Sequence, residues 1–307
     1  MFKVENLSLY TINQKEKLSL LNDISFSLNQ GDSLGIIGKS GEGKSTLAKA
    51  LLKIYDKGVF YESGTITLDN NDTQKSDRGK YISIVFQSPN SYLNPSMKVG
   101  KQIGEMLIYH FKENKKLAKE KTIKFMEELG IENAKQTYEK YPHEISGGMQ
   151  QKICLAIALI CHPKVVILDE STSYLDEKSK SDILQLLKIM QEKYKFTLIM
   201  ISHDFKEIYS MCDKIAIIHK GMIVEFGHKD EVILSACHPY SFELLLDYLR
   251  YHENIDFESY YYSNLENSNS LPILDLSPTH YARVNTSATM PSNAQIIKEK
   301  VYEIIRN

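Results

Sequence analysis

The sequence has few cysteines, no excess of charge of one sign and no long run of apolar residues. Four cysteines among 307 residues are too few and too scattered for a disulfide framework, which favours a reducing compartment. The 37 basic and 39 acidic side chains give a formal net charge of -2, so no overall positive field favours binding to nucleic acid. The longest apolar run, residues 153–161, is far shorter than the roughly 20 residues that a membrane-spanning helix needs.

The N-terminal segment also lacks the pattern of a secretion signal. Residues 1–10 contain no basic stretch followed by an apolar core. Hydrophobic residues make up 42% and charged residues 25%, which excludes collagen-like and wholly disordered chains. We expect a globular protein that stays in the cytosol unless another chain holds it at a membrane. The length predicts two domains, or one large domain with an appendage.

Apolar periodicity predicts short strands that alternate with helices. Strands are expected at residues 2–9, 24–28, 33–37, 64–68, 81–86, 165–168, 196–201 and 214–218. Helices are expected at residues 46–55, 150–160, 178–193 and 295–305, and the texture from 97 to 163 is helical throughout. The alternation predicts an α/β sheet with crossover helices and an inserted helical block.

A phosphate-binding motif of the form G-x-x-x-x-G-K-[ST] lies between a predicted strand and a predicted helix. It reads Gly38-Lys39-Ser40-Gly41-Glu42-Gly43-Lys44-Ser45, and Thr46 continues into the helix. The glycines let backbone N–H groups wrap closely around phosphate oxygens, and the helix start adds the positive end of a dipole. Lys44 would reach the β- and γ-phosphates, and the Ser45 hydroxyl would ligate Mg²⁺. With every fixed position filled, a glycine-rich turn that binds nothing is the disfavoured alternative.

A second carboxylate element follows the apolar strand at residues 165–168. Asp169, at the strand end, would hold Mg²⁺, and Glu170 would accept a proton from an attacking water. Alone, an apolar run ending in Asp-Glu is more often a strand that enters a polar turn. Together with the phosphate motif, it predicts a site that hydrolyses a nucleoside triphosphate.

Residues 141–150 carry a third motif. They read Tyr141-Pro142-His143-Glu144-Ile145-Ser146-Gly147-Gly148-Met149-Gln150. This stretch resembles the L-S-G-G-Q signature of the ATP-binding subunits of ABC transporters, with Ile145 for Leu and Met149 for Gln. The small residues Ser146, Gly147 and Gly148 precede a predicted helix, whose N-terminus would be a second anion site. The resemblance implies that this site faces the γ-phosphate bound by a partner subunit, so two nucleotide domains pair head to tail.

The same resemblance implies roles for four further residues. Gln87 would contact Mg²⁺ and the attacking water, and His203 would donate to the γ-phosphate and orient that water near Glu170. Asp176 would lie at the seam between the two subunits. Tyr10 would stack on adenine, although from its sequence position it could equally be a core residue.

Three positions depart from the family pattern. Ser171 replaces the usual proline after the catalytic glutamate, Tyr174 replaces a small residue, and Lys152 replaces an arginine. Lysine lacks the planar set of donors of arginine. We expect altered coupling between subunits rather than loss of ATPase chemistry.

Two further stretches resemble the subfamily that imports oligopeptides, dipeptides and nickel. One reads Phe86-Gln87-Ser88-Pro89-Asn90-Ser91-Tyr92-Leu93-Asn94-Pro95, and the other reads His238-Pro239-Tyr240-Ser241. The resemblance implies a peripheral protein on the cytoplasmic face of the cell membrane that binds ATP and Mg²⁺. The implied partners are permease subunits, a second ATP-binding subunit (a paralogue or an identical copy) and, indirectly, a solute-binding protein. The cargo would be a peptide or a nickel or metal chelate.

The resulting fold prediction is a P-loop ABC ATPase with a RecA-like core sheet, an N-terminal antiparallel β-subdomain and an inserted helical signature subdomain. Residues 1–250 would form the nucleotide-binding domain, with the helical subdomain at about 97–163, and residues 251–307 a linker and short extension. No cysteine follows Cys237, so the iron–sulfur cluster of many relatives would have no ligands in this tail. Two alternatives remain, namely an exporter ATPase and a soluble ABC ATPase that acts on ribosomes or DNA.

Overall fold

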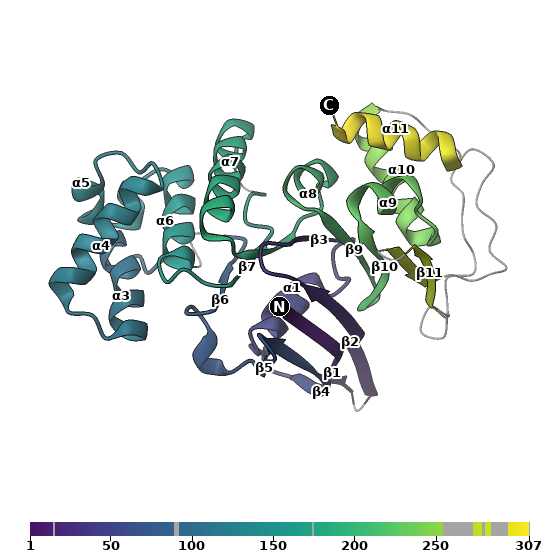
Figure 1. Cartoon of the computed structure of the whole chain (residues 1–307), viewed down its shortest axis with the longest axis horizontal. Coiled ribbons are helices and arrows are strands. Elements are labelled where there is room, and N and C mark those ends of the chain that lie inside the picture. Colours follow the sequence, from purple (N-terminus) through teal and green to yellow (C-terminus); the bar gives the residue numbers. More distant parts are fainter. Residues whose placement is uncertain are drawn as a thin grey trace.

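Two sheets and a block of helices make up the fold (Figure 1). The structure is a computed structural model that describes residues 1–14, 16–88, 92–173, 175–253, 273–277, 280–283 and 294–306. Tyr174, residues 89–91 of the subfamily motif and most of the predicted linker lie outside this set. Among the described residues, no helix is both long and apolar enough to cross a bilayer.

The smaller sheet is antiparallel, with the strand order β2-β1-β4-β5. Its strands are β1 (Phe2–Asn13), β2 (Glu16–Leu28), β4 (Val59–Leu68) and β5 (Asn71–Asp72). In β1, Phe2 and Val4 are buried, and a register shift after Val4 keeps Leu7 and Leu9 on the buried face as well. This sheet confirms the predicted N-terminal β-subdomain.

The larger sheet has the order β11-β12-β10-β9-β3-β8-β7-β6. Its strands are β3 (Ser33–Ile37), β6 (Ile82–Val85), β7 (Val165–Asp169), β8 (Thr197–Ile201), β9 (Lys214–His219), β10 (Met222–His228), β11 (Ile273–Ser277) and β12 (His280–Arg283). Strands β9, β3, β8, β7 and β6 are parallel, so their carboxyl ends meet at one edge. Loops at that edge of an open α/β sheet are where ligands bind.

Helices cover both faces of the larger sheet and extend it at one end. The helical block consists of α3 (Val99–Phe111), α4 (Lys115–Glu128), α5 (Ala134–Tyr138) and α6 (Gly147–Leu159). The other helices are α1 (Lys44–Leu51), α7 (Glu177–Tyr194), α8 (Phe205–Met211), α9 (Lys229–Leu234), α10 (Pro239–Glu253) and α11 (Ala294–Arg306). Figure 1 shows the block at one end of the molecule and α9–α11 at the other.

Two expected helices have different bounds in the structure. Helix α1 begins at Lys44 and ends at Leu51, because Lys53 adopts a left-handed φ of 56° that terminates it. Helix α6 begins at Gly147 rather than at residue 150, because the Ser146 side chain caps it. The two glycines of the signature are therefore the first turn of the helix and not a cap ahead of it.

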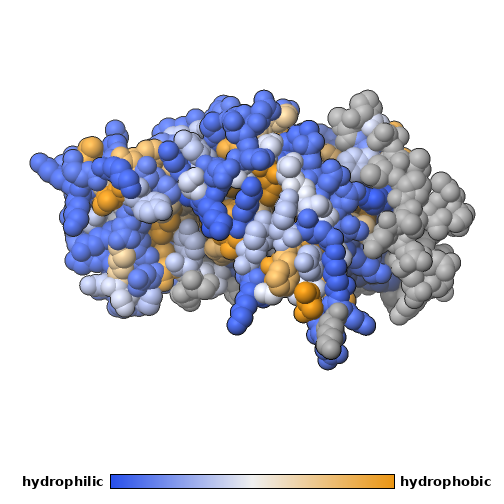
Figure 2. Space-filling model, turned by 90° about the horizontal axis from the view of Figure 1, so that it is seen from below, coloured by the Kyte–Doolittle hydropathy of each residue, from blue (hydrophilic) through white to orange (hydrophobic). Residues whose placement is uncertain are grey.

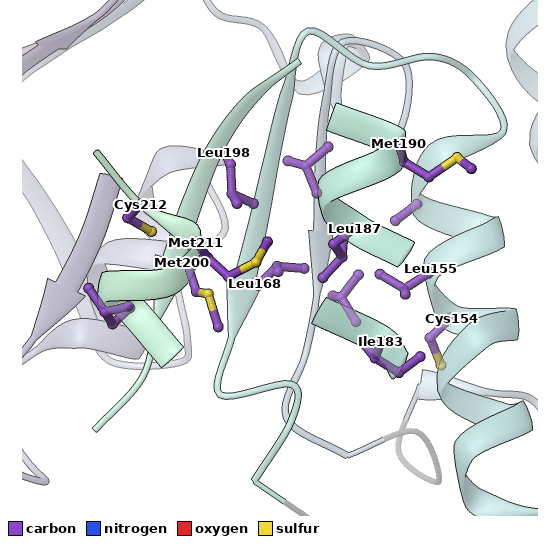
Figure 3. Close-up of a cluster of buried hydrophobic side chains, with 14 of the residues drawn as sticks. Cys154, Leu155, Leu168, Ile183, Leu187, Met190, Leu198, Met200, Met211 and Cys212 are labelled. Carbon is purple, nitrogen blue, oxygen red and sulfur yellow. The ribbon is translucent and has the colours of Figure 1, made fainter. Parts of the chain in front are cut away.

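Buried side chains form two clusters, one on each face of the larger sheet. Alternate residues of β3 and β8 point to opposite clusters, as the pleat of a strand requires. One cluster joins α1 to the smaller sheet, and the other joins the helical block to α7, α8 and α10. Figure 3 shows Cys154 and Leu155 of α6 facing Ile183 and Leu187 of α7. The Cys154 thiol is buried, and this burial raises its pKa to about 12, so Cys154 is a core thiol.

The C-terminal residues add to the sheet and to its helical layer. Strand β12 pairs antiparallel with β10, and a buried hydrogen bond joins His280 Nε2 to Glu225 Oε1 at 2.9 Å. Helix α10 runs through residue 250 to Glu253, and α11 packs on α8, α9 and α10. The domain boundary after residue 250 stays a prediction.

Candidate nucleotide site

The phosphate loop connects β3 to α1 and depends on its glycines. Gly41 and Gly43 have φ values of 88° and 97°, which side chains rarely adopt. A Cβ on Gly38 would lie 2.5 Å from the carbonyl oxygen of Ile218, so the loop approaches β9 too closely for any other residue. The backbone is thus held in the wrapped form that exposes N–H groups to an anion.

Lys44 is folded over this loop. Its Nζ donates to the carbonyl oxygens of Gly38 and Lys39, at 2.8 Å each, and the residue is 6% exposed. Burial lowers the pKa of Lys44, while the carboxylates of Glu170, Asp169 and Glu42 oppose that shift. A buried ammonium group beside the backbone N–H groups of a loop forms a site suited to phosphate oxygens.

Ser45 and Asp169 lie in contact at the edge of the sheet. The Ser45 hydroxyl donates to Asp169 Oδ1 at 3.0 Å, across 124 positions of sequence. Asp169 is buried, which raises the pKa of its carboxyl, and the Ser45 hydrogen bond opposes that shift. A hydroxyl and a carboxylate are the hard oxygen donors that Mg²⁺ prefers, so these residues fit the predicted ion.

Glu170 is fixed in direction by its backbone. Its φ of 47° is left-handed, its N–H donates to the carbonyl oxygen of Ile201 at 3.0 Å, and its Oε2 accepts from Gln87 Nε2 at 3.0 Å. A non-glycine residue in this conformation is unfavourable and persists only where the surrounding structure holds it. The structure therefore brings Gln87, from the end of β6, to the carboxylate at the end of β7.

A cavity of about 580 Å³ opens beside the phosphate loop. Its lining includes Gly38 and Lys39 of the loop, Thr172 after β7, His203 after β8 and Tyr248 of α10. His203 is exposed and shares this cavity with the loop, as the sequence predicts for a group that reaches a phosphate.

The signature residues lie elsewhere on the chain. Ser146 Oγ accepts from the Met149 N–H at 3.4 Å, and both Ser146 and Gly147 are exposed. A Cβ on Gly148 would lie 3.4 Å from Ser179 Oγ, at the start of α7. The exposed signature turn therefore lies at the surface, and none of its residues lines the cavity beside the phosphate loop.

Asp176 caps α7 next to the signature. Its carboxylate accepts from the Ser179 N–H at 3.0 Å and from the Ser179 hydroxyl at 2.7 Å, and these bonds lower the pKa of Asp176. Two helix N-termini, of α6 and α7, thus lie side by side on an exposed surface. Of the departures from the family pattern, Lys152 donates to the carbonyl oxygen of Gly130 at 3.2 Å, and Ser171 is buried.

Tyr10 is partly exposed and does not belong to either core cluster. Its ring stacks on Phe60 at 5.3 Å between centroids, and Lys17 Nζ lies 4.6 Å from the Tyr10 ring centroid. Tyr10 pairs with Ser19 across the sheet, next to Leu20, whose carbonyl oxygen lies against Gly43 of the phosphate loop. Strand β1 is therefore linked to the loop through β2, and the contact of the Tyr10 ring with adenine stays a prediction.

Sequence reasoning did not anticipate the link between this loop and α10. Tyr240 Oη accepts from the Lys39 N–H at 2.9 Å, and Lys39 Nζ pairs with Asp247 Oδ2 at 2.9 Å. The Glu42 side chain accepts from the Lys220 N–H and contacts His219, so its carboxylate is held at the turn between β9 and β10. Tyr240 belongs to the His-Pro-Tyr-Ser stretch, whose resemblance to the subfamily implies no contact with the phosphate loop.

Comparison with known proteins agrees with this geometry. The family described as ABC transporter matches residues 21–173. An oligopeptide transport ATP-binding protein OppD from Bacillus subtilis is 35% identical over 253 residues, covering 80% of this chain and 71% of the relative. OppD from Escherichia coli is 36% identical over 235 residues, covering 74% of this chain and 69% of the relative.

Solved structures agree on the fold. The dimeric bacterial ABC transporter cassette MJ0796 aligns with a TM-score of 0.65 and 23% identity, over 75% of this chain and 99% of that one. The protein cbiO1 from Clostridium perfringens, part of the transporter complex cbiONQ, aligns with a TM-score of 0.64 and 26% identity, over 82% of this chain and 95% of that one. Fold, motifs and relatives agree, and the chain belongs to the ABC transporter family as an ATP-binding and ATP-hydrolysing subunit.

Proposed function

We propose that this chain supplies the energy of ATP hydrolysis to a membrane importer of peptides. The observation that carries the proposal is the cluster of Lys44, Ser45, Asp169, Glu170 and Gln87 at the carboxyl edge of the sheet, in which Ser45 donates to Asp169 and Gln87 donates to Glu170. Relatives at 35% and 36% identity are oligopeptide transport ATP-binding proteins, which supports a peptide as the cargo.

Each residue of the cluster has a distinct task in this proposal. Lys44 and the N–H groups of the phosphate loop bind the β- and γ-phosphates, and Tyr10 stacks on adenine. Ser45, Asp169 and Gln87 would hold Mg²⁺, which when bound neutralises phosphate charge. Glu170 takes a proton from the attacking water.

His203 completes the site from the neighbouring loop. It donates to the γ-phosphate and orients the attacking water near Glu170. Its exposed position in the cavity beside Gly38 supports this role.

Hydrolysis in this proposal needs a second ATP-binding subunit. The signature turn at Ser146–Gly148 and the cap at Asp176 face outward, so they serve a nucleotide held by a partner's phosphate loop. The outward direction of two exposed helix N-termini supports this arrangement. The partner is a paralogue or a second copy of this chain.

The chain would act from the cytoplasmic face of the membrane, bound to permease subunits. Figure 2 shows one face of the molecule on which hydrophilic side chains predominate and hydrophobic ones form small separate patches, which supports attachment through protein partners. The Gln87 loop, between the core sheet and the helical block, is the segment that would pass motion to a permease.

Transport assays with the co-purified membrane complex test the proposal. Vesicles that contain the chain and its permeases should accumulate radiolabelled oligopeptides when ATP is supplied, and complexes with Lys44→Ala should not. Uptake of Ni²⁺ instead of peptide would show that the cargo is a metal and not a peptide. ATP-driven release of peptide would favour an exporter. Failure of the chain to co-purify with any permease would favour the soluble class.

A further inference from the structure

We propose that Glu207, a buried carboxylate on α8, is a positioning residue that fixes His203 relative to Glu170. This inference rests on the proposed function, since it assigns His203 and Glu170 their tasks. Glu207 is 4% exposed and accepts donors from three separate segments of the chain. Glu207 belongs to none of the phosphate, signature and carboxylate motifs.

The Glu207 carboxylate joins the loops that follow β7 and β8. Its Oε1 accepts from the Thr172 hydroxyl at 2.7 Å, and its Oε2 accepts from the Ser202 hydroxyl at 2.5 Å. Thr172 is two residues after Glu170, and Ser202 immediately precedes His203. One carboxylate therefore bridges the segments that carry the proposed base and the proposed phosphate donor.

Lys180 of α7 closes this network. Its Nζ lies 2.7 Å from Glu207 Oε1 and 2.8 Å from Asp204 Oδ2, and Asp204 is the residue after His203. Burial alone lowers the pKa of Lys180, but its bonds to Asp204 and Glu207 outweigh that effect and raise it. The two neighbours of His203 in sequence, Ser202 and Asp204, are thus both bonded to the Lys180–Glu207 pair.

Helix α8 provides a rigid base for the carboxylate. A Cβ on Gly35 of β3 would lie 2.2 Å from Ile208 Cγ2, so α8 rests directly on the central strand. The Ser202 N–H donates to the carbonyl oxygen of Ile36 at 3.4 Å, which ties the loop after β8 to the same strand. Small displacements of the network would therefore be transmitted to His203 rather than absorbed by the helix.

Packing alone does not explain a carboxylate at this position. The other inward residues of α8, Phe205, Ile208 and Met211, are apolar and buried. A buried ion pair is weak support for stability, since apolar residues of similar volume are often as stable. A carboxylate with four oxygen lone-pair directions does what an apolar residue cannot: it orients two hydroxyls and an ammonium group at once.

Substitution of Glu207 by Gln tests the role at nearly constant volume. We expect Glu207→Gln to lower kcat for ATP by about 10- to 100-fold, because small misplacements of reacting groups cost that much. The KM for ATP should stay within about twofold, because the phosphate loop is intact. Ser202→Ala, which leaves the Lys180–Glu207 pair in place, should also lower kcat. Glu192→Gln, at an exposed site of α7, is the matched control and should leave kcat unchanged.

A double-mutant cycle separates positioning from a general loss of structure. In a His203→Ala background, Glu207→Gln should lower kcat by less than about twofold, because the group that it positions is gone. An undiminished loss in that background would overturn the inference, and so would a wild-type kcat in both Glu207→Gln and Ser202→Ala. Absence of ATP turnover in the wild-type complex would instead contradict the proposed function.

Discussion

At the scale of single residues, the ammonium group of Lys44 lies near three carboxylates, those of Glu170, Asp169 and Glu42. Lys44 is almost completely buried, and its Nζ is held by the carbonyl oxygens of Gly38 and Lys39. A bound phosphate would offer the Lys44 ammonium group a negatively charged partner, where the loop itself offers only neutral carbonyl oxygens. We therefore expect the affinity for a nucleotide to depend strongly on this one side chain.

Lys44→Ala should weaken ATP binding while the chain stays folded. Loss of a charged hydrogen-bonding group costs about 1.5–3 kcal/mol, which corresponds to roughly a 10- to 100-fold higher Kd. Isothermal titration with ATP and Mg²⁺ measures the change, and Lys53→Ala, outside the loop, serves as the control. An unaltered Kd for ATP would refute the assigned phosphate contact.

At the scale of elements, the core sheet was predictable because its strands are short apolar runs. Residues 33–37 and 165–168 were predicted almost to the residue. Strands that are buried on both faces read as continuous apolar runs, and both segments do so. The phosphate loop and the signature were predictable because fixed spacings of glycine, lysine and serine carry their chemistry. Helix ends were less predictable, because α1 ends on a left-handed lysine and α6 begins on glycines.

The contacts of Glu207 and Tyr240 could not have been found in the sequence. Phe205, Ile208 and Met211 recur at helical spacing, so Glu207 falls off the apolar stripe and looks exposed. Its partners lie on other elements, 35 positions away at Thr172 and 27 at Lys180, and no local pattern links them. Such networks become visible only once the topology brings the strand ends together.

The close approach of α8 to β3 gives a prediction about stability. Gly35→Ala places a methyl group 2.2 Å from Ile208, so α8 must shift, at a cost of about 1–3 kcal/mol. Urea unfolding followed by circular dichroism measures this difference. Gly147→Ala is the matched control, because its Cβ would meet nothing within 4 Å and alanine favours a helix. Equal stability of the two variants would show that α8 is not seated on β3.

At the scale of the whole molecule, the proposal assigns each chain half of what hydrolysis needs. The phosphate loop and the strand ends form one surface, and the N-termini of α6 and α7 form another that faces outward. The proposal therefore separates ATP binding, which one chain performs, from ATP turnover, which requires two.

Gly147→Asp tests that separation. The site has open space around it, and an acidic residue in the first turn of α6 favours the helix, so the fold should be kept. The carboxylate would repel a partner's γ-phosphate, so ATPase activity should be lost while the chain's own Kd for ATP stays within about twofold of wild type. A variant that hydrolyses ATP normally would contradict the outward role of the signature.

The most direct measurement of the central claim is ATP turnover and assembly by Glu170→Gln. Removal of the proposed general base should lower kcat by about 100-fold or more, while ATP and Mg²⁺ still bind. The account predicts that this variant accumulates ATP-bound assemblies of two nucleotide-binding subunits, detectable by analytical ultracentrifugation with labelled ATP. Hydrolysis at the wild-type rate, or a variant that binds ATP without ever pairing, would contradict it.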